Sequence, residues 1–493
     1  MTQHFPILLI LVLFFGALLI AIFGRLGKRV PWMMAVGSTL LAFCLSLALL
    51  FEVLEDGVIR YSLGGWAPPI GIELVYDRLS AFISVVILGV STLVLVHARE
   101  PVERENGENR IGYFATALLA VGGFSGIVGT GDLFNLYVFL EISSLASYAL
   151  IGSGGARSAV AAFRYLILGT IGASFYLLGL GFVFIQTGSL NMADIHNILR
   201  TDGLDQAILV GILLMITGTG LKMALLPLHQ WLPDAYTYAP ATSSSLIAPI
   251  GTKVGAYVMI RLVFGVFPTR LVLDQLPLLE IIGILGAIGI VWGSVMAIPQ
   301  HNLKRMLAYS SVAQIGYIAL GIGLGTAFGL IGAVLHILNH ACMKACLFLV
   351  SSNLESNGKG IEIKGLGPSL RRDMPWSSAA FTVAAISMIG LPPTAGFFSK
   401  WYLLLGSFEE DRFVFVAVIL LSSLLNAVYF FRILERIYLG PAESEPSDSA
   451  QHPTPSFLRI FSPLILGAGL LVLGLGNAII VTHILEPMLP IAR

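Results

Sequence analysis

Residues 335–350, LHILNHACMKACLFLV, place three ionisable side chains inside an apolar helical stretch. His336, His340 and Lys344 recur at every fourth position, so they share one face of a helix. An ionisable group near the bilayer centre costs at least about 2.5–3.5 kcal/mol on insertion scales, and such groups usually face the interior of a helix bundle. The stretch therefore predicts a polytopic membrane protein with a polar axis inside it.

The rest of the chain has the same character. Of 493 residues, 56% are hydrophobic and 11% are charged, whereas a soluble domain has roughly 45–50% and 25%. This composition excludes a soluble protein, and the formal net charge of zero gives no indication of a nucleic-acid partner. Cys44, Cys342 and Cys346 form no CxxC pair, so we predict no iron–sulfur, zinc or disulfide site.

Apolar runs of about twenty residues, the length that crosses a hydrocarbon core of about 30 Å, follow one another along the chain. Cytoplasmic loops are enriched in Lys and Arg, and most of the loop Lys and Arg residues fall in the odd-numbered loops. Both termini are therefore predicted to face outward. We predict an all-α protein of about fourteen transmembrane helices, near 5–24, 32–52, 77–97, 111–129, 131–152, 159–186, 207–229, 242–263, 277–298, 306–323, 326–350, 376–404, 412–439 and 459–483.

Four lysines and one glutamate fall inside these predicted helices. Glu141 is the only acid near the middle of a span, and it is too short to reach an interface. Snorkelling to an interface is the alternative for the lysines, more so for Lys222 and Lys344 than for Lys253. A buried carboxylate beside a lysine stabilises the ammonium form, so a Glu141–Lys222 pair would act as a proton switch. The four lysines are Lys222, Lys253, Lys344 and Lys400.

The two histidines of residues 335–350 extend this set. Histidine is the side chain best suited to relay protons near neutral pH, and three titratable groups in line favour a relay over hydrogen-bonded core histidines. A metal site needs further ligands that the neighbouring residues do not offer. We therefore predict neither a metal nor a cofactor for this chain.

Two of the predicted helices contain breaks. Proline removes a backbone donor and clashes with the preceding turn, and a broken membrane helix is tolerated where it lines protein or a wet cavity. A simple kink is the alternative, but each break has a lysine nearby, Lys222 or Lys400. The breaks are MALLPLHQWLP (223–233), with Pro227 and Pro233, and SMIGLPPTAGFFSKW (387–401), with Pro392, Pro393 and Gly396.

The broken seventh and twelfth helices are five helices apart, which suggests two inverted five-helix repeats, helices 4–8 and 9–13. Each repeat would supply half a channel. The predicted organisation is residues 1–110 for the first three helices, 111–263 and 277–439 for the two half-channels, and 440–493 for a cytoplasmic loop and the last helix. Residues 440–455 are acidic and rich in Ser and Pro, and we assign them no role.

Several segments resemble the proton-translocating antiporter-like subunits shared by respiratory complex I, membrane-bound hydrogenases and Mrp-type multisubunit Na⁺/H⁺ antiporters. The form of the fifth and twelfth helices is most similar to the D-type subunits of the Mrp group. The segments are DLFNLYVFLEISSLASYAL (132–150), LKMALLPLHQWLPDAYTYAPA (221–241), SSSLIAPIGTKVGAY (243–257), NLKRMLAYSSVAQIGYI (302–318), HILNHACMKACLFL (336–349) and LPPTAGFFSKW (391–401).

The resemblance implies a role for each buried group. Glu141 and Lys222 would form the charged pair of the first half-channel, and Lys253 would bridge to the second. His336, His340 and Lys344 would continue the axis to Lys400, the terminal exchange residue. Some complex I subunits have glutamate at that last position, where this chain has lysine.

Two functions of different class follow. The chain would be the proton-translocating subunit of a multisubunit sodium/proton antiporter, or a pump module of a redox enzyme driven by electron transfer elsewhere in its complex. In neither case is the chain itself predicted to be an enzyme. Its partners would be a second antiporter-like subunit, small membrane subunits, H⁺ and Na⁺, in a bacterial or archaeal cell membrane. A self-sufficient carrier is disfavoured because Glu141 is the only mid-membrane carboxylate.

Overall fold

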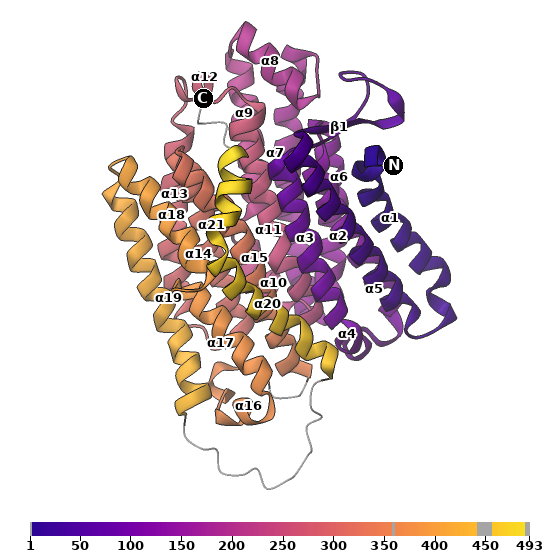
Figure 1. Ribbon diagram of the computed structural model, residues 1–493, viewed down its shortest axis with the longest axis vertical. Helices are drawn as coiled ribbons and strands as arrows, with labels where there is room; N and C mark the ends of the chain where they lie inside the picture. Colours follow the sequence, from indigo (N-terminus) through magenta and orange to yellow (C-terminus); the bar gives the residue numbers. More distant parts are fainter. Residues whose placement is uncertain (1, 357–359, 441–455, 489–493) are drawn as a thin grey trace.

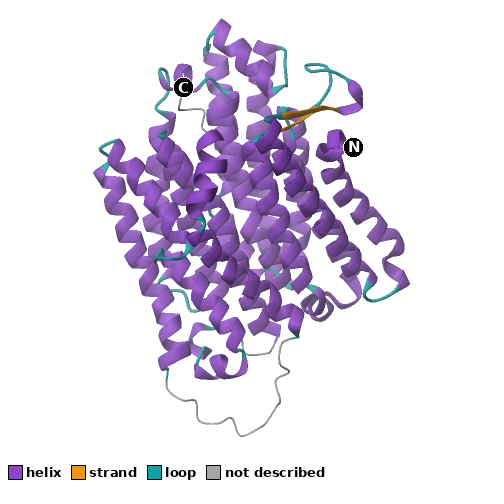
Figure 2. Cartoon of the chain, viewed as in Figure 1, coloured by secondary structure: helices purple, strands orange, loops and turns teal. Residues whose placement is uncertain are grey.

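The computed structural model describes residues 2–356, 360–440 and 456–488 of the chain. They form one bundle of roughly parallel and antiparallel helices, with a short two-stranded sheet at one end (Figures 1 and 2). Within the described residues, 13 helices are long and apolar enough to cross a membrane. A helix satisfies its own backbone hydrogen bonds, which the hydrocarbon core demands, so the polytopic all-α prediction is confirmed.

Most helices in the first half of the bundle match the predicted spans within a few residues, but the predicted span 207–229 extends six residues beyond the end of α9. A β-hairpin, β1 (Ile59–Ser62) with antiparallel β2 (Glu73–Tyr76), connects α2 to α3. The helices are α1 (Phe5–Phe23), α2 (Val30–Asp56), α3 (Arg78–His97), α4 (Arg99–Asn106), α5 (Arg110–Gly129), α6 (Leu133–Gly152), α7 (Ala156–Thr187), α8 (Met192–Asp202), α9 (Gln206–Met223), α10 (Trp231–Tyr238) and α11 (Ala241–Ile260).

The second half contains the shorter segments. Helix α11 continues as a π-helical turn over Arg261–Val266, and a second such turn covers Val481–Leu485. The helices are α12 (Thr269–Leu273), α13 (Leu278–Ala297), α14 (Leu303–Leu324), α15 (Ala327–Ser356), α16 (Pro368–Asp373), α17 (Pro375–Ile389), α18 (Ala395–Glu409), α19 (Phe413–Leu439), α20 (Phe457–Leu475) and α21 (Asn477–Ile480).

The predicted span 376–404 consists of two short helices, α17 and α18, which together complete the count of fourteen with the 13 long ones. The predicted last span, 459–483, is also interrupted, because α20 ends at Leu475 and a separate helix, α21, follows Gly476. Part of the predicted loop 440–455 lies outside the described residues.

Three helices occupy the centre of the bundle. The apolar windows of α11, α14 and α15 are 89%, 89% and 94% buried, whereas those of α2 and α19 are 33% buried. The outer helices therefore present apolar side chains to lipid or to other subunits. Lys253, His336, His340 and Lys344 all lie on the central helices, which is where the cost of an ionisable group is compensated by protein partners.

Close helix packing holds the walls of this centre. Between α7 and α9, a Cβ added at Gly218 would lie 2.3 Å from the carbonyl oxygen of Gly172. Small residues allow such backbone contact between membrane helices, where burial of apolar surface supplies little attraction. The contact fixes the position of the last turns of α9, which carry Lys222.

Candidate functional site

The first group of the site joins α6 to the end of α9. The ammonium of Lys222 lies 3.9 Å from a carboxylate oxygen of Glu141. Nζ of Lys222 also donates to Oγ of Ser144 at 2.7 Å and to the hydroxyl of Tyr148 at 3.3 Å. Residues 141, 144 and 148 are three and four positions apart, so α6 presents all three groups from one face. The structure therefore places the predicted pair together and adds two hydroxyl partners.

The break in this half places Lys222 at a helix end. Helix α9 ends at Met223 because Ala224 adopts the left-handed conformation, with φ of 62°. The carbonyl end of a helix carries partial negative charge, which favours an ammonium in its last turn. Pro227 lies in the connection to α10, whereas Pro233 lies in the first turn of α10, where no helical hydrogen bond is lost.

A glycine on α7, Gly169, leaves room for this group because it has no side chain. A Cβ added at Gly169 of α7 would lie 1.9 Å from the Tyr148 hydroxyl and 3.5 Å from Nζ of Lys222. Any larger residue at this position would displace Tyr148. The residue type at position 169 therefore determines the geometry around Lys222, although nothing in the sequence pattern singled it out.

A small cavity leads from this group to α11. Its volume is about 30 Å³, and its walls include Lys222, Thr219 and Ser144 on one side and Gly251 and Gly255 of α11 on the other. One water molecule occupies about that volume. The cavity connects the first group to the helix that carries Lys253.

Lys253 lies on α11 and is 2% exposed. Its Nζ donates to the carbonyl of Ala248 at 2.6 Å and to Oγ1 of Thr252 at 3.4 Å. Among the described residues, no carboxylate pairs with it. The partners are neutral, so this site can release a proton without separating an ion pair.

The histidines continue the axis on α15. His336 contacts Oγ of Ser399 and Oε1 of Gln314, both at 2.9 Å. The rings of His336 and His340 stack with centroids 6.0 Å apart. Both nitrogens of His340 are buried, and neither has a hydrogen-bond partner within the described residues. His336 lies one turn before His340 on α15, and Lys344 lies one turn after it.

The two remaining lysines bind backbone carbonyls. Nζ of Lys344 donates to the carbonyl of Leu307 at 2.6 Å and also to Oγ of Ser310. Nζ of Lys400 donates to the carbonyls of Met388 and Ile389, at 3.1 and 2.9 Å, across the break between α17 and α18. Both lysines therefore interact with helix carbonyls in place of carboxylates.

The second break is formed as the sequence indicated. Pro392 and Pro393 lie in the connection between α17 and α18. Gly396 lies in the first turn of α18, where an added Cβ would lie 1.9 Å from the carbonyl oxygen of Ser387. The connection brings Lys400 back against the end of α17, and its Nζ lies 4.9 Å from the ring centroid of Tyr317.

Sequence reasoning missed the neutral partners and one lysine. Ser144, Tyr148, Gln314, Tyr317 and Ser399 connect the titratable groups, but isolated polar residues in apolar helices carry no pattern. Lys304, which the sequence placed in a loop, is 2% exposed and pairs with Glu355 at 3.5 Å. No group of three or more His, Cys, Asp or Glu within the described ranges is arranged to hold a metal ion.

Comparison with known proteins agrees with this architecture. Residues 130–426 match the family described as NADH:quinone oxidoreductase/Mrp antiporter, TM. The N subunit of NADH-quinone oxidoreductase from Desulforudis audaxviator is 44% identical over 99% of each chain. The D subunit of the Na⁺/H⁺ antiporter from Alkalihalophilus pseudofirmus is 29% identical over 93% of this chain and 91% of the relative.

A solved structure shows the same arrangement of helices. It is that of the membrane-bound sulfane sulfur reductase, an archaeal respiratory membrane complex, which contains a chain 30% identical to this one. The TM-score is 0.89, and the match covers 98% of this chain and 96% of the other. The chain is a multi-pass membrane protein and belongs to the NADH:quinone oxidoreductase/Mrp antiporter family of membrane subunits.

Proposed function

We propose that this chain translocates protons through the row of buried groups formed by Glu141, the four lysines and the two histidines. The observation that carries the proposal is the burial of four lysines in membrane helices, 0–7% exposed, of which one pairs with a carboxylate in the part of the chain that the structure describes. Unpaired buried cations destabilise a membrane protein. A function that needs them to gain and lose protons explains their presence. The lysines are Lys222, Lys253, Lys344 and Lys400.

The transfer begins at the Glu141–Lys222 pair. The carboxylate at 3.9 Å stabilises the ammonium form of Lys222. When the carboxylate moves away or takes up a proton, Lys222 releases its own proton. The cavity of about 30 Å³ beside it provides a place for a water molecule to carry the proton towards α11.

From α11, the central groups continue the path. Lys253 exchanges with His340, whose buried nitrogens need partners that water would supply. His336 receives the proton and passes it through Ser399 on α18, the helix that carries Lys400. Gln314 fixes the imidazole from its other side. In this scheme, the positive charge of Lys344 adjusts how readily the neighbouring groups on α15 bind protons.

The two breaks correspond to two half-channels, residues 111–263 and 277–439, related as inverted repeats. Each break supports this division by placing a lysine against helix carbonyls or at a helix end. Both termini face the outer side of a bacterial or archaeal cell membrane in this scheme, as the distribution of Lys and Arg among the loops predicts.

The parent complex is of one of two kinds. A sodium/proton antiporter is supported by the relative of Alkalihalophilus pseudofirmus, at 29% identity. A redox-driven proton pump is supported by the relative of Desulforudis audaxviator, at 44% identity, and by the chain of the archaeal respiratory complex, at 30%. The higher identity favours the redox-driven complex, so we place the chain there as a pump component without a cofactor of its own.

Co-purification tests the kind of complex. A tagged chain would be captured from gently solubilised native membranes, and its partners identified by mass spectrometry. Flavin- or iron–sulfur-containing subunits would establish the redox-driven pump. A second antiporter-like chain with small membrane subunits, and without redox proteins, would establish the antiporter and overturn our placement.

Proton flux tests the translocation itself. The purified complex would be reconstituted in vesicles that contain a pH-sensitive dye. Lys222→Met should reduce the flux at least tenfold while the complex stays assembled. Lys364→Met, the same change at an exposed lysine, serves as the control. An unchanged flux in Lys222→Met would refute the proposed relay.

A further inference from the structure

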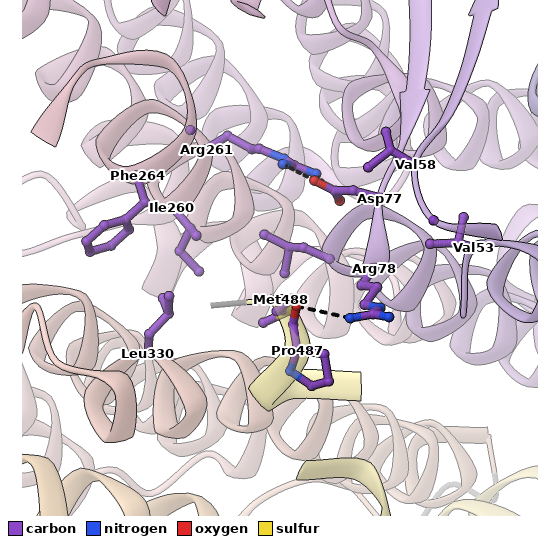
Figure 3. A pocket seen from close by; sticks show the side chains of 13 residues that line it. Val53, Val58, Asp77, Arg78, Ile260, Arg261, Phe264, Leu330, Pro487 and Met488 are labelled. Carbon is purple, nitrogen blue, oxygen red and sulfur yellow. Dashed lines mark hydrogen bonds and ion pairs between the residues drawn. The ribbon is translucent and has the colours of Figure 1, made fainter. Parts of the chain in front are cut away.

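A large cavity lies at the end of the bundle that carries the β-hairpin (Figure 3). Its volume is about 770 Å³, and its walls come from the connection after α2, the start of α3, the end of α11 and the C-terminal turn. A second cavity of about 180 Å³ shares Val58, Asp77, Arg261 and Gly265 with it. Since one water molecule takes about 30 Å³, both cavities have room for water.

An ion pair stands between the two cavities. Nη1 of Arg261 donates to Oδ2 of Asp77 at 2.5 Å, and Nη2 donates to Oδ1 (Figure 3). Asp77 also caps α3 by accepting from the backbone N–H of Ser80. Burial acts to raise the pKa of Asp77, but Arg261 and Ser80 hold it at about 2. The carboxylate is therefore ionised at neutral pH, and the pair is closed.

The same arginine is connected to the proton path along α11. Lys253, Tyr257 and Arg261 are four residues apart and share one face of the helix. Nε of Arg261 donates to the Tyr257 hydroxyl at 2.8 Å, and that hydroxyl donates to the carbonyl of Val128 at 2.8 Å. At 1.5 Å per residue, Arg261 lies about 12 Å along the axis from Lys253.

The local backbone also distinguishes this end of α11. The helix changes to π-helical geometry at Arg261–Val266, and such turns are frequent at functional sites because they leave carbonyls less regularly paired. An ion pair that only held α3 against α11 would need neither cavities on both sides of it nor a hydrogen bond to Tyr257.

We propose that the cavity at Arg261 is an aqueous access route for protons to Lys253, with the Asp77–Arg261 ion pair as its gate. This inference rests on the proposed proton translocation and adds to it the place where the central lysine takes up protons from water. Lys253 now points towards Ala248, but its flexible stem can turn towards Tyr257. When Arg261 leaves the Tyr257 hydroxyl, water follows from the cavity and donates a proton to that oxygen, while the hydroxyl turns from the Val128 carbonyl and passes its own proton to Lys253 in its neutral form.

Gly265 offers a way to block the route. It lines both cavities, and a Cβ added there would meet only Cδ of Arg261, at 3.8 Å. Gly265→Cys therefore places a thiol beside the gate without a clash. The native cysteines would first be replaced by alanine, and the purified complex reconstituted in vesicles. A membrane-impermeant, cationic methanethiosulfonate reagent would then be added, and labelling measured by mass spectrometry.

Labelled Gly265→Cys should lose proton flux at least tenfold, whereas unlabelled Gly265→Cys and labelled Val414→Cys should keep it. Val414 is 72% exposed at the start of α19 and does not line either cavity. If Gly265→Cys does not assemble, Val58→Cys, which lines the same cavities, replaces it. Full labelling with unchanged flux, or a thiol that the reagent does not reach, would overturn the access route. Absence of flux before labelling would instead contradict the proposed function.

Discussion

The Glu141→Gln variant tests the charge relation on which the first transfer step depends. Glutamine preserves the shape of the side chain but removes its charge. At 3.9 Å, the attraction between the two unit charges is about 4 kcal/mol at an effective dielectric constant of about 20. Desolvation and water around the partly exposed Glu141, whose side chain is 26% exposed, reduce the net value.

If about one third of that attraction lowers the barrier to proton transfer, its removal raises the barrier by about 1.4 kcal/mol. This increase slows the transfer about tenfold. Proton flux in vesicles that contain the purified complex should therefore fall about tenfold, while native gel electrophoresis shows the same assembly. Glu435→Gln, the same change at an exposed position on α19, should leave the flux unchanged.

A double-mutant cycle then isolates the pair. If Glu141 acts through Lys222, Glu141→Gln should have almost no further effect on a Lys222→Met protein, because the interaction is already lost. Normal flux in Glu141→Gln, or strictly additive losses in the double variant, would refute the reasoning.

Three further predictions concern other positions. Gly169→Ala should lower the flux several-fold because its methyl group would lie 1.9 Å from the Tyr148 hydroxyl. Gly181→Ala on the same helix, where an added Cβ has nothing within 4 Å, should leave the flux unchanged. Equal fluxes for the two variants in the vesicle assay would count against this role of Gly169. His340→Asn should reduce flux about tenfold with normal assembly, and loss of the complex from the membrane would instead indicate a core histidine. Arg459→Ala should act on stability, because it removes two hydrogen bonds to Asn353, at 3.1 Å each. His97 still contacts Oδ1 of Asn353, so the backbone carbonyl of Asn353 is the acceptor that loses its arginine partner, at a cost of about 1–3 kcal/mol. Thermal unfolding in detergent should therefore occur at lower temperature, and an unchanged midpoint would contradict this assignment.

Much of the fold could be predicted because the membrane imposes one simple rule. Apolar runs of sufficient length must be helices, and the fourteen spans follow from it. The exact path of the backbone at the two helix breaks could not be predicted from this rule. The chain leaves the helix at Ala224, three residues before Pro227, because Ala224 adopts a left-handed conformation that its residue type does not predict.

The titratable residues of the site could also be found from the sequence, since charge inside an apolar run is rare. Their partners could not. The contacts of His336 with Gln314 and Ser399 join three different helices, and only the tertiary packing brings them together. Lys304 shows the opposite error, because its position near a predicted helix end gave no indication of its burial against Glu355.

Lys253 provides the most direct test of the whole account, because it lies on the central helix α11 and leads from the first half-channel to the second in the proposed path. The measurement is proton flux by the reconstituted complex carrying Lys253→Met, compared with Lys364→Met at an exposed site. We predict a loss of at least tenfold with all partner subunits retained. Flux within twofold of the control would show that protons do not pass through the central lysine, and it would contradict the relay.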